Sequence, residues 1–568
     1  MVEKLEASMM NMDRVVEELK KVLGEEYVSI DTVDLVPYGK DFYTPVAKAF
    51  LGTVAEAGIL VLPSTTEEVA AVVRIANKYK IPITPFALGT NMASNATPSR
   101  KGAITMDLRR MKKVKVNPET LTATIQPAVS FGRLEYILEQ YGLKAPSHIG
   151  SGAGGFIGNW VQANVRPFNC EGGMTDPVVT AEIVLPTGEI MRTGSMAMKD
   201  EKYMEENPFV RMAFGPDIVG LWRGSIGAFG IVTSVTIRVH KKGEVEKRLK
   251  IGFPDLETLV KVSDEIQYNR IGIAAVANNR EGAFSVITSP TERELMDKEQ
   301  LKKLKDSIPE WVLMLNLEGT REQVEAEEKV VKKILKEYGG DYIEFPQPFK
   351  KFMERFDSFA SHHGGAQIFA LAEPTSMIAL WCQTPRKYIV NFYNETVQKM
   401  KELDIRHVTT NEPFLGRWFL VPHDRGVTNL VGVDLDFTEL DEQSYKKAME
   451  FLVNYLPIME KNYGVIPLVM GPLADLILMP SYTDLLKALK KLIDPNNIMN
   501  PDRLIMGMEK VHLTAEIKGY LTGLLKAKKM LEEHTYEEAL ELLNKEIQRI
   551  KVDETRFTTT VEGYETAG

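Results

Sequence analysis

Apolar positions in the first third of the chain follow two periods, and together they predict a β-α-β unit. Residues 58–63 read Gly-Ile-Leu-Val-Leu-Pro, a short run typical of a buried strand. Residues 67–80 carry valine, isoleucine and alanine at helical spacing, which predicts an amphipathic helix. Ser64 and Glu67 have the spacing of a capping box at the start of that helix. Residues 81–85 then predict the second strand.

The same patterns continue through the next part of the chain. Alternating or β-branched residues predict four further strands, at residues 103–108, 122–127, 178–186 and 227–239. Thr187-Gly188 marks a tight turn, so residues 178–194 are expected to form a hairpin. Residues 1–45 read as a helix over Met12–Leu23 followed by an irregular segment.

From about residue 243 the pattern of charged and apolar residues changes, which predicts a second α+β domain. Charged amphipathic helices alternate there with apolar strands: helices at 322–338 and 442–462, strands at 311–317 and 429–437. The stretch Asp494–Leu504 is rich in asparagine and proline and is expected to end the folded body. Two further helices are expected over residues 507–551, and a capping box at Thr535–Glu538 opens the second.

Composition narrows the function classes. The 568-residue chain has 69 basic and 78 acidic residues and a net charge of −9, so no basic excess favours nucleic acid as a partner. Two cysteines, Cys170 and Cys382, give no disulfide framework, and we expect a reducing, cytoplasmic setting. The N-terminus lacks the apolar run of a signal peptide, and no uninterrupted apolar stretch of about 18 residues predicts a membrane span.

Two glycine-bearing segments carry the strongest chemical signal. The first glycine segment is residues 85–92, Pro-Phe-Ala-Leu-Gly-Thr-Asn-Met, and the second is residues 150–159, Gly-Ser-Gly-Ala-Gly-Gly-Phe-Ile-Gly-Asn. Glycine permits turns that bring main-chain N–H groups close to an anion. Two such segments can hold a diphosphate from both sides, as FAD requires. The spacing Gly150-x-Gly152-x-x-Gly155 also fits a Rossmann fingerprint or a plain turn, but Pro146 interrupts the strand that the fingerprint needs.

Several motifs in order resemble the vanillyl-alcohol oxidase and 4-cresol dehydrogenase flavoprotein family. The matching stretches are LPSTTEEV (62–69), PFALGTN (85–91), QPAVSFGRL (126–134), GGFIGN (154–159), VLPTGEIMRTG (184–194), GAFGIVT (227–233) and DPNNIMNP (494–501). The resemblance implies an α+β, two-domain FAD-binding PCMH-type fold with an α+β cap domain over the flavin and a helical C-terminal extension. It divides the chain into an N-terminal helical segment (1–45), FAD-binding domain (46–242), cap (243–465), return segment to the FAD-binding domain (466–506) and extension (507–568).

The resemblance also implies which residues hold the cofactor. Carried over motif by motif, these are Leu88, Gly89, Thr90, Asn91, Met92, Ser151, Gly152, Gly155, Ile157, Gly158, Asn159, Gly227, Ile231, Asn500 and Arg503. The first glycine segment and the cap strand near Thr428 carry no histidine where relatives link their flavin. Non-covalent FAD is therefore expected.

Candidate catalytic residues are fewer. Glu171 falls near the place where phenol-oxidising relatives carry an acidic residue close to flavin N5, and a carboxylate there can accept a proton. His362, His423 and Arg425 are the cap candidates, and His423 is expected to lie in a loop with Asp424 and Arg425. No metal site is expected because His362 and its neighbour would point to opposite faces of a strand. The tyrosines and arginine that bind a phenolate in relatives are missing, since Ser94 and Val465–Leu473 stand in their places.

The resulting prediction is an FAD-linked oxidase or dehydrogenase. It transfers a hydride from a CH–OH or benzylic carbon of a small organic substrate to flavin N5 and passes the electrons to a separate acceptor, such as a cytochrome, an iron–sulfur protein or an electron-transfer flavoprotein. Two alternatives remain: a D-2-hydroxy acid dehydrogenase subunit of the glycolate or lactate type, and an FAD-binding electron-transfer subunit with reduced catalysis. An NADPH-dependent enzyme of related fold is disfavoured because nothing indicates a nicotinamide site. A homo-oligomer is expected.

Overall fold

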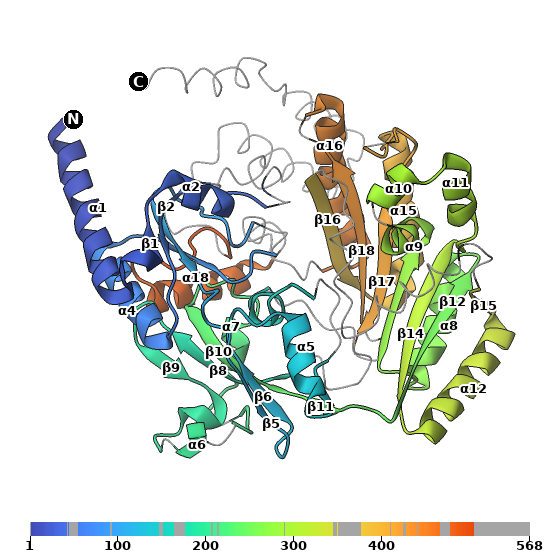
Figure 1. The fold of residues 1–568 in the computed structure, drawn as a ribbon. Helices are drawn as coiled ribbons and strands as arrows, with labels where there is room; N and C mark the ends of the chain where they lie inside the picture. The colour runs from blue at the N-terminus through green and yellow to red at the C-terminus, as the bar shows by residue number, and fades with distance from the viewer. Residues whose placement is uncertain are drawn as a thin grey trace. The chain divides into compact units, whose positions relative to one another are not determined.

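The structure is a computed structural model (Figure 1). It describes residues 2–41, 44, 55–90, 94–146, 152–163, 176–200, 202–205, 208–212, 215–288, 290–344, 349, 376–408, 410–423, 426, 428–438, 440–465 and 478–504. The chain divides into two compact units, and the second, residues 49–52 and 507–568, lies outside the described residues. The predicted helices at 507–551 are therefore not addressed.

The first sheet is built around the predicted β-α-β unit. Its order within the described chain is β1-β2-β4-β3, with β2 and β3 both parallel to β4. Helices α1 and α4 pack against it through one apolar cluster that includes Leu19, Val72 and Ile104. The bounds are α1 (Val2–Leu23), η1 (Glu25–Tyr27), β1 (Val28–Ser29), α2 (Thr32–Leu35), η2 (Val36–Tyr38), β2 (Ala57–Val61), α4 (Thr66–Tyr79), β3 (Ile83–Phe86) and β4 (Ala103–Asp107).

The capping box of α4 is shifted by one residue from its predicted place. Thr65, not Ser64, is the N-cap, and its side chain accepts a hydrogen bond from the backbone N–H of Glu68. The Glu68 carboxylate accepts in turn from the backbone N–H of Ser64 at 2.6 Å. A capping box is therefore present, but Thr65 and Glu68 form it, not Ser64 and Glu67. The run Ser-Thr-Thr-Glu-Glu satisfies the capping-box spacing in two registers.

A second sheet completes this half of the chain. Its order within the described residues is β5-β6-β10-β8-β9, and the predicted turn at Thr187-Gly188 joins β8 to β9 as a hairpin. The bounds are β5 (Val114–Asn117), β6 (Thr122–Ile125), α5 (Phe131–Glu139), β7 (Leu143–Lys144), π-helix η3 (Ile157–Gln162), β8 (Val178–Val184), β9 (Ile190–Arg192), η4 (Gly194–Ala197), α6 (Lys202–Glu205), α7 (Val219–Trp222), β10 (Ile231–Arg238) and β11 (His240–Lys241). Because β7 pairs only with β11, antiparallel, among the described strands, the Rossmann reading of the second glycine segment is wrong.

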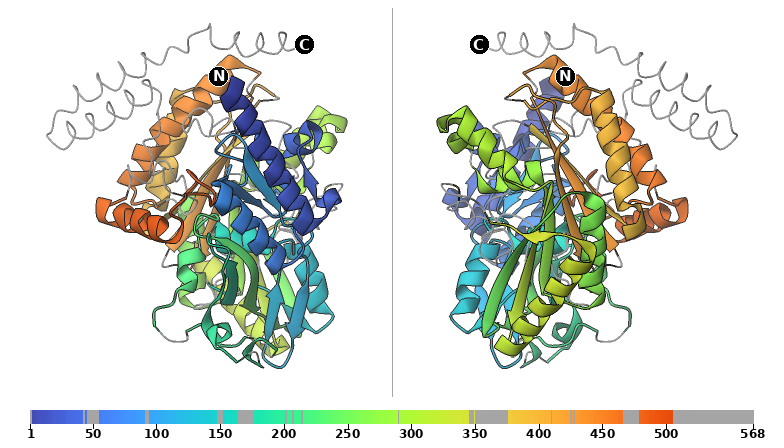
Figure 2. Two further views of the ribbon diagram at one scale, coloured as in Figure 1. Left: turned by 90° about the vertical axis from the view of Figure 1, so that its left-hand side faces the viewer. Right: turned by 90° about the vertical axis from the view of Figure 1, so that its right-hand side faces the viewer.

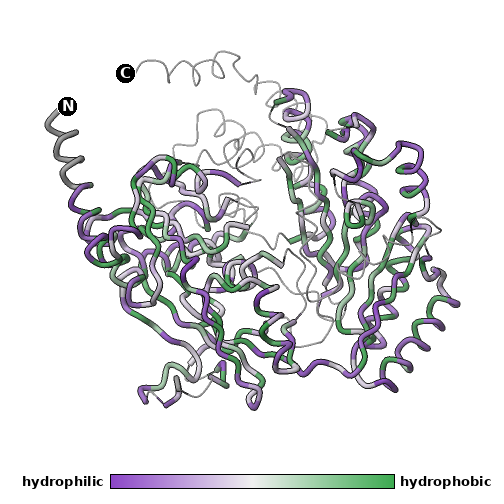
Figure 3. Tube along the Cα trace, in the orientation of Figure 1, coloured by the Kyte–Doolittle hydropathy of each residue, from purple (hydrophilic) through white to green (hydrophobic). Residues whose placement is uncertain are grey.

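The cap is a seven-stranded sheet in the described residues, ordered β15-β12-β14-β13-β17-β18-β16. Figure 3 shows its strands as mostly hydrophobic. The bounds are β12 (Val245–Phe253), α8 (Leu256–Tyr268), β13 (Ala274–Asn279), α9 (Arg280–Ile287), α10 (Pro290–Leu295), α11 (Lys298–Asp306), β14 (Trp311–Gly319), α12 (Arg321–Tyr338), β15 (Asp341–Tyr342), β16 (Ser376–Thr384), η6 (Arg386–Tyr388), α15 (Ile389–Glu402), β17 (Arg417–His423), β18 (Thr428–Phe437) and α16 (Glu442–Lys461). Helix α18 (Pro480–Ile493) belongs to the return segment.

The two faces of the cap sheet have different partners. Helices α8, α12, α15 and α16 cover one face (Figures 1 and 2). On that face Phe392 of α15 packs edge-on against Trp418 of β17. Side chains of the opposite face, Met314 and Phe419 among them, belong to one apolar cluster with Trp160 of η3. We call this the inner face of the cap sheet. It therefore shares its core with the segment that carries the second glycine motif.

A buried ion pair also joins the cap to the rest of the chain. Lys144 of β7 pairs with Glu318 of β14, and Glu318 also accepts from the backbone N–H of Gly243 at 2.5 Å. β11 ends before the predicted domain boundary at 242/243, and β12 begins after it. This boundary and the other domain limits remain predictions. Of the helices in the described ranges, none is both long and apolar enough to cross a bilayer.

Candidate functional site

The first glycine segment leaves β3 through a turn that only glycine accommodates well. Gly89 has φ +69°, and a Cβ there would lie 2.4 Å from the ring of Phe86. Tyr38 supports that ring edge-on, with the ring centroids 4.7 Å apart. The Tyr38 hydroxyl donates to the buried Asp107 carboxylate at 2.6 Å, and burial raises the pKa of Tyr38 well above its usual range. Leu88, Gly89 and Thr90 lie in this turn, whereas Asn91 and Met92 are outside the described residues.

Beyond the turn, Ser94 has a structural partner. Its backbone N–H and its hydroxyl both donate to the Asp41 carboxylate, at 2.6 and 2.9 Å. Ser94 is fully buried and stands where phenol-oxidising relatives were expected to carry a tyrosine. The hydroxyl here fixes the end of the segment.

The second glycine segment lies along the start of α5. The backbone N–H groups of Phe131 and Gly132 donate to the carbonyls of Gly154 and Gly152, at 3.0 and 2.8 Å. A Cβ on Gly132 would come within 3.3 Å of the Gly152 carbonyl oxygen, which is a tight contact. Main-chain pairing therefore sets the path of the segment. Ser151 is outside the described residues.

The two glycine segments lie beside each other at Leu88 and Gly155. A Cβ on Gly155 would lie 3.7 Å from a methyl carbon of Leu88 and 3.4 Å from the carbonyl oxygen of Pro127. Beside this contact, a Cβ on Gly158 would meet no atom of the described residues within 4 Å. The Leu88 side chain thus lies between the two segments that are predicted to hold one diphosphate.

Other predicted residues of the second segment serve the fold through their side chains. Ile157 is buried in the apolar cluster of the inner face. The Asn159 amide donates to the Gly155 carbonyl at 2.8 Å. Ile231, at the start of β10, is likewise a core residue, 2% exposed. Any contact of Ile157 or Ile231 with a cofactor would have to come from the main chain.

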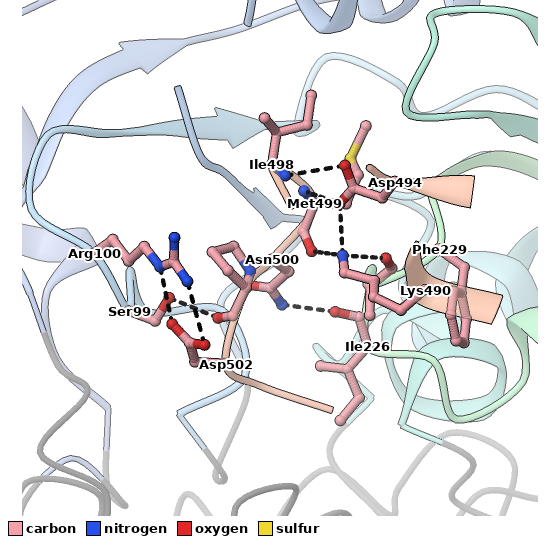
Figure 4. A network of polar contacts seen from close by, with 12 residues as sticks. Ser99, Arg100, Ile226, Phe229, Lys490, Asp494, Ile498, Met499, Asn500 and Asp502 are labelled. Atoms are coloured by element: carbon pink, nitrogen blue, oxygen red, sulfur yellow. Dashed lines mark hydrogen bonds and ion pairs between the residues drawn. The ribbon is translucent and has the colours of Figure 1, made fainter. Parts of the chain in front are cut away.

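The return segment meets the first glycine segment at Gly227. Gly227 has φ +74°, and a Cβ there would lie 2.6 Å from Pro85 and 3.8 Å from the Cβ of Asn500. Residues from three distant stretches of sequence therefore come together. Ser99 and Arg100 add to this contact, by bonds to the Pro501 carbonyl at 2.6 Å and to the Asp502 carboxylate at 3.0 Å (Figure 4).

A buried lysine holds the return segment in place. The Lys490 ammonium donates to the carbonyls of Ala228 and Met499, each at 2.7 Å, and to the Asp494 carboxylate at 2.6 Å (Figure 4). Asp494 also accepts from the backbone N–H groups of Ile498 and Met499, at 3.0 and 2.8 Å. Burial lowers the pKa of Lys490, and the neighbouring Asp494 opposes that shift. This arrangement fixes the turn that presents Asn500.

Asn500 has a buried acceptor to offer. Its amide group donates both hydrogens, to the carbonyls of Asn95 at 2.9 Å and Ile226 at 2.6 Å, and its backbone N–H donates to Ile83. Its Oδ1 is buried and accepts no hydrogen bond from the described residues. An orphaned buried acceptor is costly unless a donor arrives. Hydroxyl and N–H groups of FAD are such donors, so these residues fit the predicted cofactor.

The Arg503 side chain forms hydrogen bonds to main-chain carbonyls. Its guanidinium donates to the carbonyls of Thr97 and Pro98, at 2.7 and 3.2 Å. Burial lowers the pKa of Arg503 to about 10, while Asp41 and Asp502 act in the opposite direction. The side chain remains charged at neutral pH and braces the residues that follow the first glycine segment.

Of the predicted catalytic residues, only His423 is described. It is fully buried at the end of β17 and pairs with Thr428 of β18, so its expected position in a loop is wrong. Glu171, His362 and Arg425 lie outside the described residues. No group of three or more His, Cys, Asp and Glu side chains in the described ranges is arranged to hold a metal ion.

The inner face of the cap sheet carries polar residues that sequence reasoning missed. Arg417 of β17 pairs through both guanidinium arms with Asp436 of β18, at 2.5 and 2.6 Å. Asp434 accepts from the indole N–H of Trp381 at 2.9 Å. All four residues are at most 9% exposed. The available signal was the pair of carboxylates at alternate positions in the apolar strand Val431–Phe437.

Comparisons with known proteins agree with this geometry. A family model of the FAD binding domain matches residues 57–194, and one of the FAD linked oxidases, C-terminal domain, matches residues 479–504. The chain is 25% identical over 542 residues to the 4-cresol dehydrogenase [hydroxylating] flavoprotein subunit of Pseudomonas putida, covering 86% of this chain and 95% of that one. It is 25% identical over 466 residues to glycolate oxidase subunit GlcD of Bacillus subtilis, covering 80% and 91%. The crystal structure of p-cresol methylhydroxylase with substrate bound matches with a TM-score of 0.71 at 22% identity, over 87% of this chain and 97% of that one.

Proposed function

We propose a reaction and an electron route for this chain, which is an FAD-linked oxidoreductase, a homologue of the 4-cresol dehydrogenase flavoprotein subunit with the PCMH-type fold and with FAD as its cofactor. The proposed reaction removes a hydride from a CH–OH or benzylic carbon of a small organic molecule. The electrons then leave to a separate acceptor. The predicted resemblance to this flavoprotein family, the α+β fold class, the enzyme class and the cofactor are thereby confirmed. The reaction and the electron route are the proposal.

One observation carries the proposal: Leu88 of the first glycine segment lies beside Gly155 of the second. In this proposal their main-chain N–H groups hold the cofactor diphosphate, and the Asn500 acceptor takes a hydrogen bond from another group of the same molecule. When bound, the flavin supplies a two-electron acceptor for hydride. The chain supplies position and water exclusion.

The inner face of the cap sheet is proposed as the substrate side. Trp381 and Phe419 pack edge-on, 5.2 Å apart, over Gly432, where a Cβ would lie within 2.5 Å of either ring. This apolar surface continues into the cluster that includes Trp160 of η3. A phenolate substrate is disfavoured, because Ser94 stands at the position where a tyrosine hydroxyl would bind it. The Ser94 hydroxyl donates its hydrogen to Asp41 instead.

We further propose non-covalent FAD and a protein acceptor. The first glycine segment and β18 carry no histidine to link the flavin. The Pseudomonas putida relative is named a flavoprotein subunit, which favours a complex in which electrons pass to another chain. The homo-oligomer remains a prediction.

Anaerobic mixing of the FAD-loaded chain with a substrate panel tests the proposal. The panel contains benzylic alcohols, aliphatic alcohols, alkylated aromatics and D-2-hydroxy acids, and bleaching of the flavin reports reduction. Bleaching by an alcohol or an alkylated aromatic supports the proposed reaction. Bleaching by hydroxy acids alone would favour the alternative to which the similarity to GlcD points. Reduction only by a partner protein would favour an electron-transfer subunit.

A further inference from the structure

Three charged residues share the inner face at one end of the cap sheet. Arg417 of β17 lies directly opposite Asp434 of β18, and Asp434 lies opposite Ala379 of β16. Because side chains alternate along a strand, Asp436 and Trp381 project from the same face. The cluster formed by Arg417, Asp434, Asp436 and Trp381 is therefore a built feature of three neighbouring strands.

The charges in this cluster do not balance. Both arms of the Arg417 guanidinium bind Asp436, an arrangement that pairs one cation with one carboxylate. Asp434 is the second carboxylate. Only its Oδ1 has a donor among the described residues, the indole N–H of Trp381. One carboxylate oxygen thus remains for a hydroxyl hydrogen.

Burial holds Asp434 in a range useful for proton transfer. Burial raises the pKa of Asp434 to about 6, Arg417 and the Trp381 hydrogen bond act against the rise, and Asp436 adds to it. On the three strands of the cluster, the other ionisable side chains of this face in the described residues are Arg417 and, at the far end of β17, His423, together with Asp436 of β18, whereas β16 contributes none. Glu246, Arg248 and Lys250 of β12 and Glu318 of β14 share the face but lie on other strands of the sheet. At neutral pH Asp434 is therefore mostly ionised and more basic than an exposed aspartate.

Buried aromatic rings adjoin this carboxylate on the same face. Trp381, which binds Asp434, also packs edge-on against Phe419 over Gly432. Both rings belong to the apolar cluster that contains Phe156 of the second glycine segment and Trp160, the residue that follows this segment. A molecule lying on these rings would have its polar end at Asp434.

Resting on the proposed function, we infer that Asp434 is the general base of the reaction and that the substrate is a neutral alcohol whose apolar body lies against Trp381 and Phe419. The hydroxyl proton passes to the Asp434 carboxylate. The C–O single bond becomes C=O, and the C–H hydrogen leaves with its electron pair for the flavin. The product is an aldehyde or ketone, and no further oxidant is needed for this half-reaction.

The same charges select against 2-hydroxy acids. A substrate carboxylate placed here would meet the ionised Asp434, while the guanidinium of Arg417 is already taken by Asp436. A neutral alcohol meets no such repulsion. The substrate class therefore follows from which carboxylate Arg417 neutralises.

Asp434→Asn tests the inference, because asparagine keeps an acceptor for Trp381 and removes the base. Anaerobic reduction by the best neutral alcohol of the panel should slow by about 100-fold or more. The wild-type rate should rise with pH and level off above about pH 6, and this rise should vanish in the variant. Asp306→Asn, at an exposed position, is the matched control and should change neither.

A second measurement does not depend on turnover. Benzoate, titrated into the FAD-loaded protein by calorimetry at about pH 8, should bind at least about tenfold more tightly to the Asp434→Asn variant than to the wild type. Three results would overturn the inference and leave the proposed function standing. The Asp434→Asn variant could be reduced at a rate within about fivefold of wild type, or it could bind benzoate with unchanged affinity. Alternatively, the wild type could prefer a 2-hydroxy acid to its neutral alcohol counterpart. A wild type whose flavin no substrate of the panel reduces would overturn both.

Discussion

Replacing Lys490 with methionine should loosen the return segment and weaken FAD binding together. Methionine keeps most of the apolar stem but removes three hydrogen bonds, two to main-chain carbonyls and one to Asp494. Lys490 is 5% exposed and Asp494 is 1% exposed, so the carboxylate would remain buried with only two backbone donors. Removing one partner of a buried ion pair costs about 3–5 kcal/mol of unfolding free energy.

The effect on the cofactor follows from Asn500. Lys490 and Asp494 fix the turn at Met499, directly before the Asn500 amide that is proposed to face FAD. If loosening the turn removes one hydrogen bond to the cofactor, the dissociation constant of FAD should rise about tenfold, equivalent to about 1.4 kcal/mol.

Urea unfolding and flavin-fluorescence titration measure the two effects. Lys491→Met is the matched control, because Lys491 is the next residue of α18 and is exposed, and it should change stability by less than about 0.5 kcal/mol. Adding Asp494→Leu to Lys490→Met should restore part of the lost stability, since no unpaired charge then stays buried. A Lys490→Met variant within about 1 kcal/mol of wild type and with unchanged FAD affinity would refute the reasoning.

Two further predictions concern single residues. Gly89→Ala should weaken FAD binding at least about tenfold in the same titration, because the new Cβ would strike the Phe86 ring at 2.4 Å; Gly102→Ala shares the positive φ, meets no described atom within 4 Å, and should leave the affinity unchanged. Asp434→Asn should become more stable relative to wild type as pH rises from about 4 to about 6, by up to about 3 kcal/mol in urea unfolding, because the raised pKa of Asp434 means that the folded wild type loses stability across this window. A constant difference between the two proteins at all pH values would contradict the second.

Most of the fold could be predicted from patterns among residues that are close together in sequence. The hairpin at Thr187-Gly188 and helix α12 are encoded by residues that are neighbours in sequence, and both lie where the periodicity indicated. Helix starts are less sharply encoded, since the run Ser64–Glu68 fits two capping boxes and the bond from Thr65 decides between them. His423 was misplaced because Pro, Asp, Arg and Gly surround it, whereas pairing with β18 extends the strand to its end.

The site was predictable where motifs exist and hidden where long-range pairing decides. Gly89, Gly155 and Asn500 follow from ordered motifs, and the structure brings their segments together. The cluster on the inner face could not be predicted, because Arg417 and Asp434 become neighbours only through the pairing of β17 with β18. An aspartate within an apolar strand shows that a charge is buried, but not which cation it lacks.

An experimental structure of the FAD-loaded chain tests the central claim most directly. The account predicts that the diphosphate lies within hydrogen-bond distance of backbone N–H groups from both glycine segments, near Leu88–Thr90 and near Gly152–Gly158, where Leu88 lies beside Gly155. A diphosphate bound by only one of these segments, or elsewhere on the chain, would contradict it.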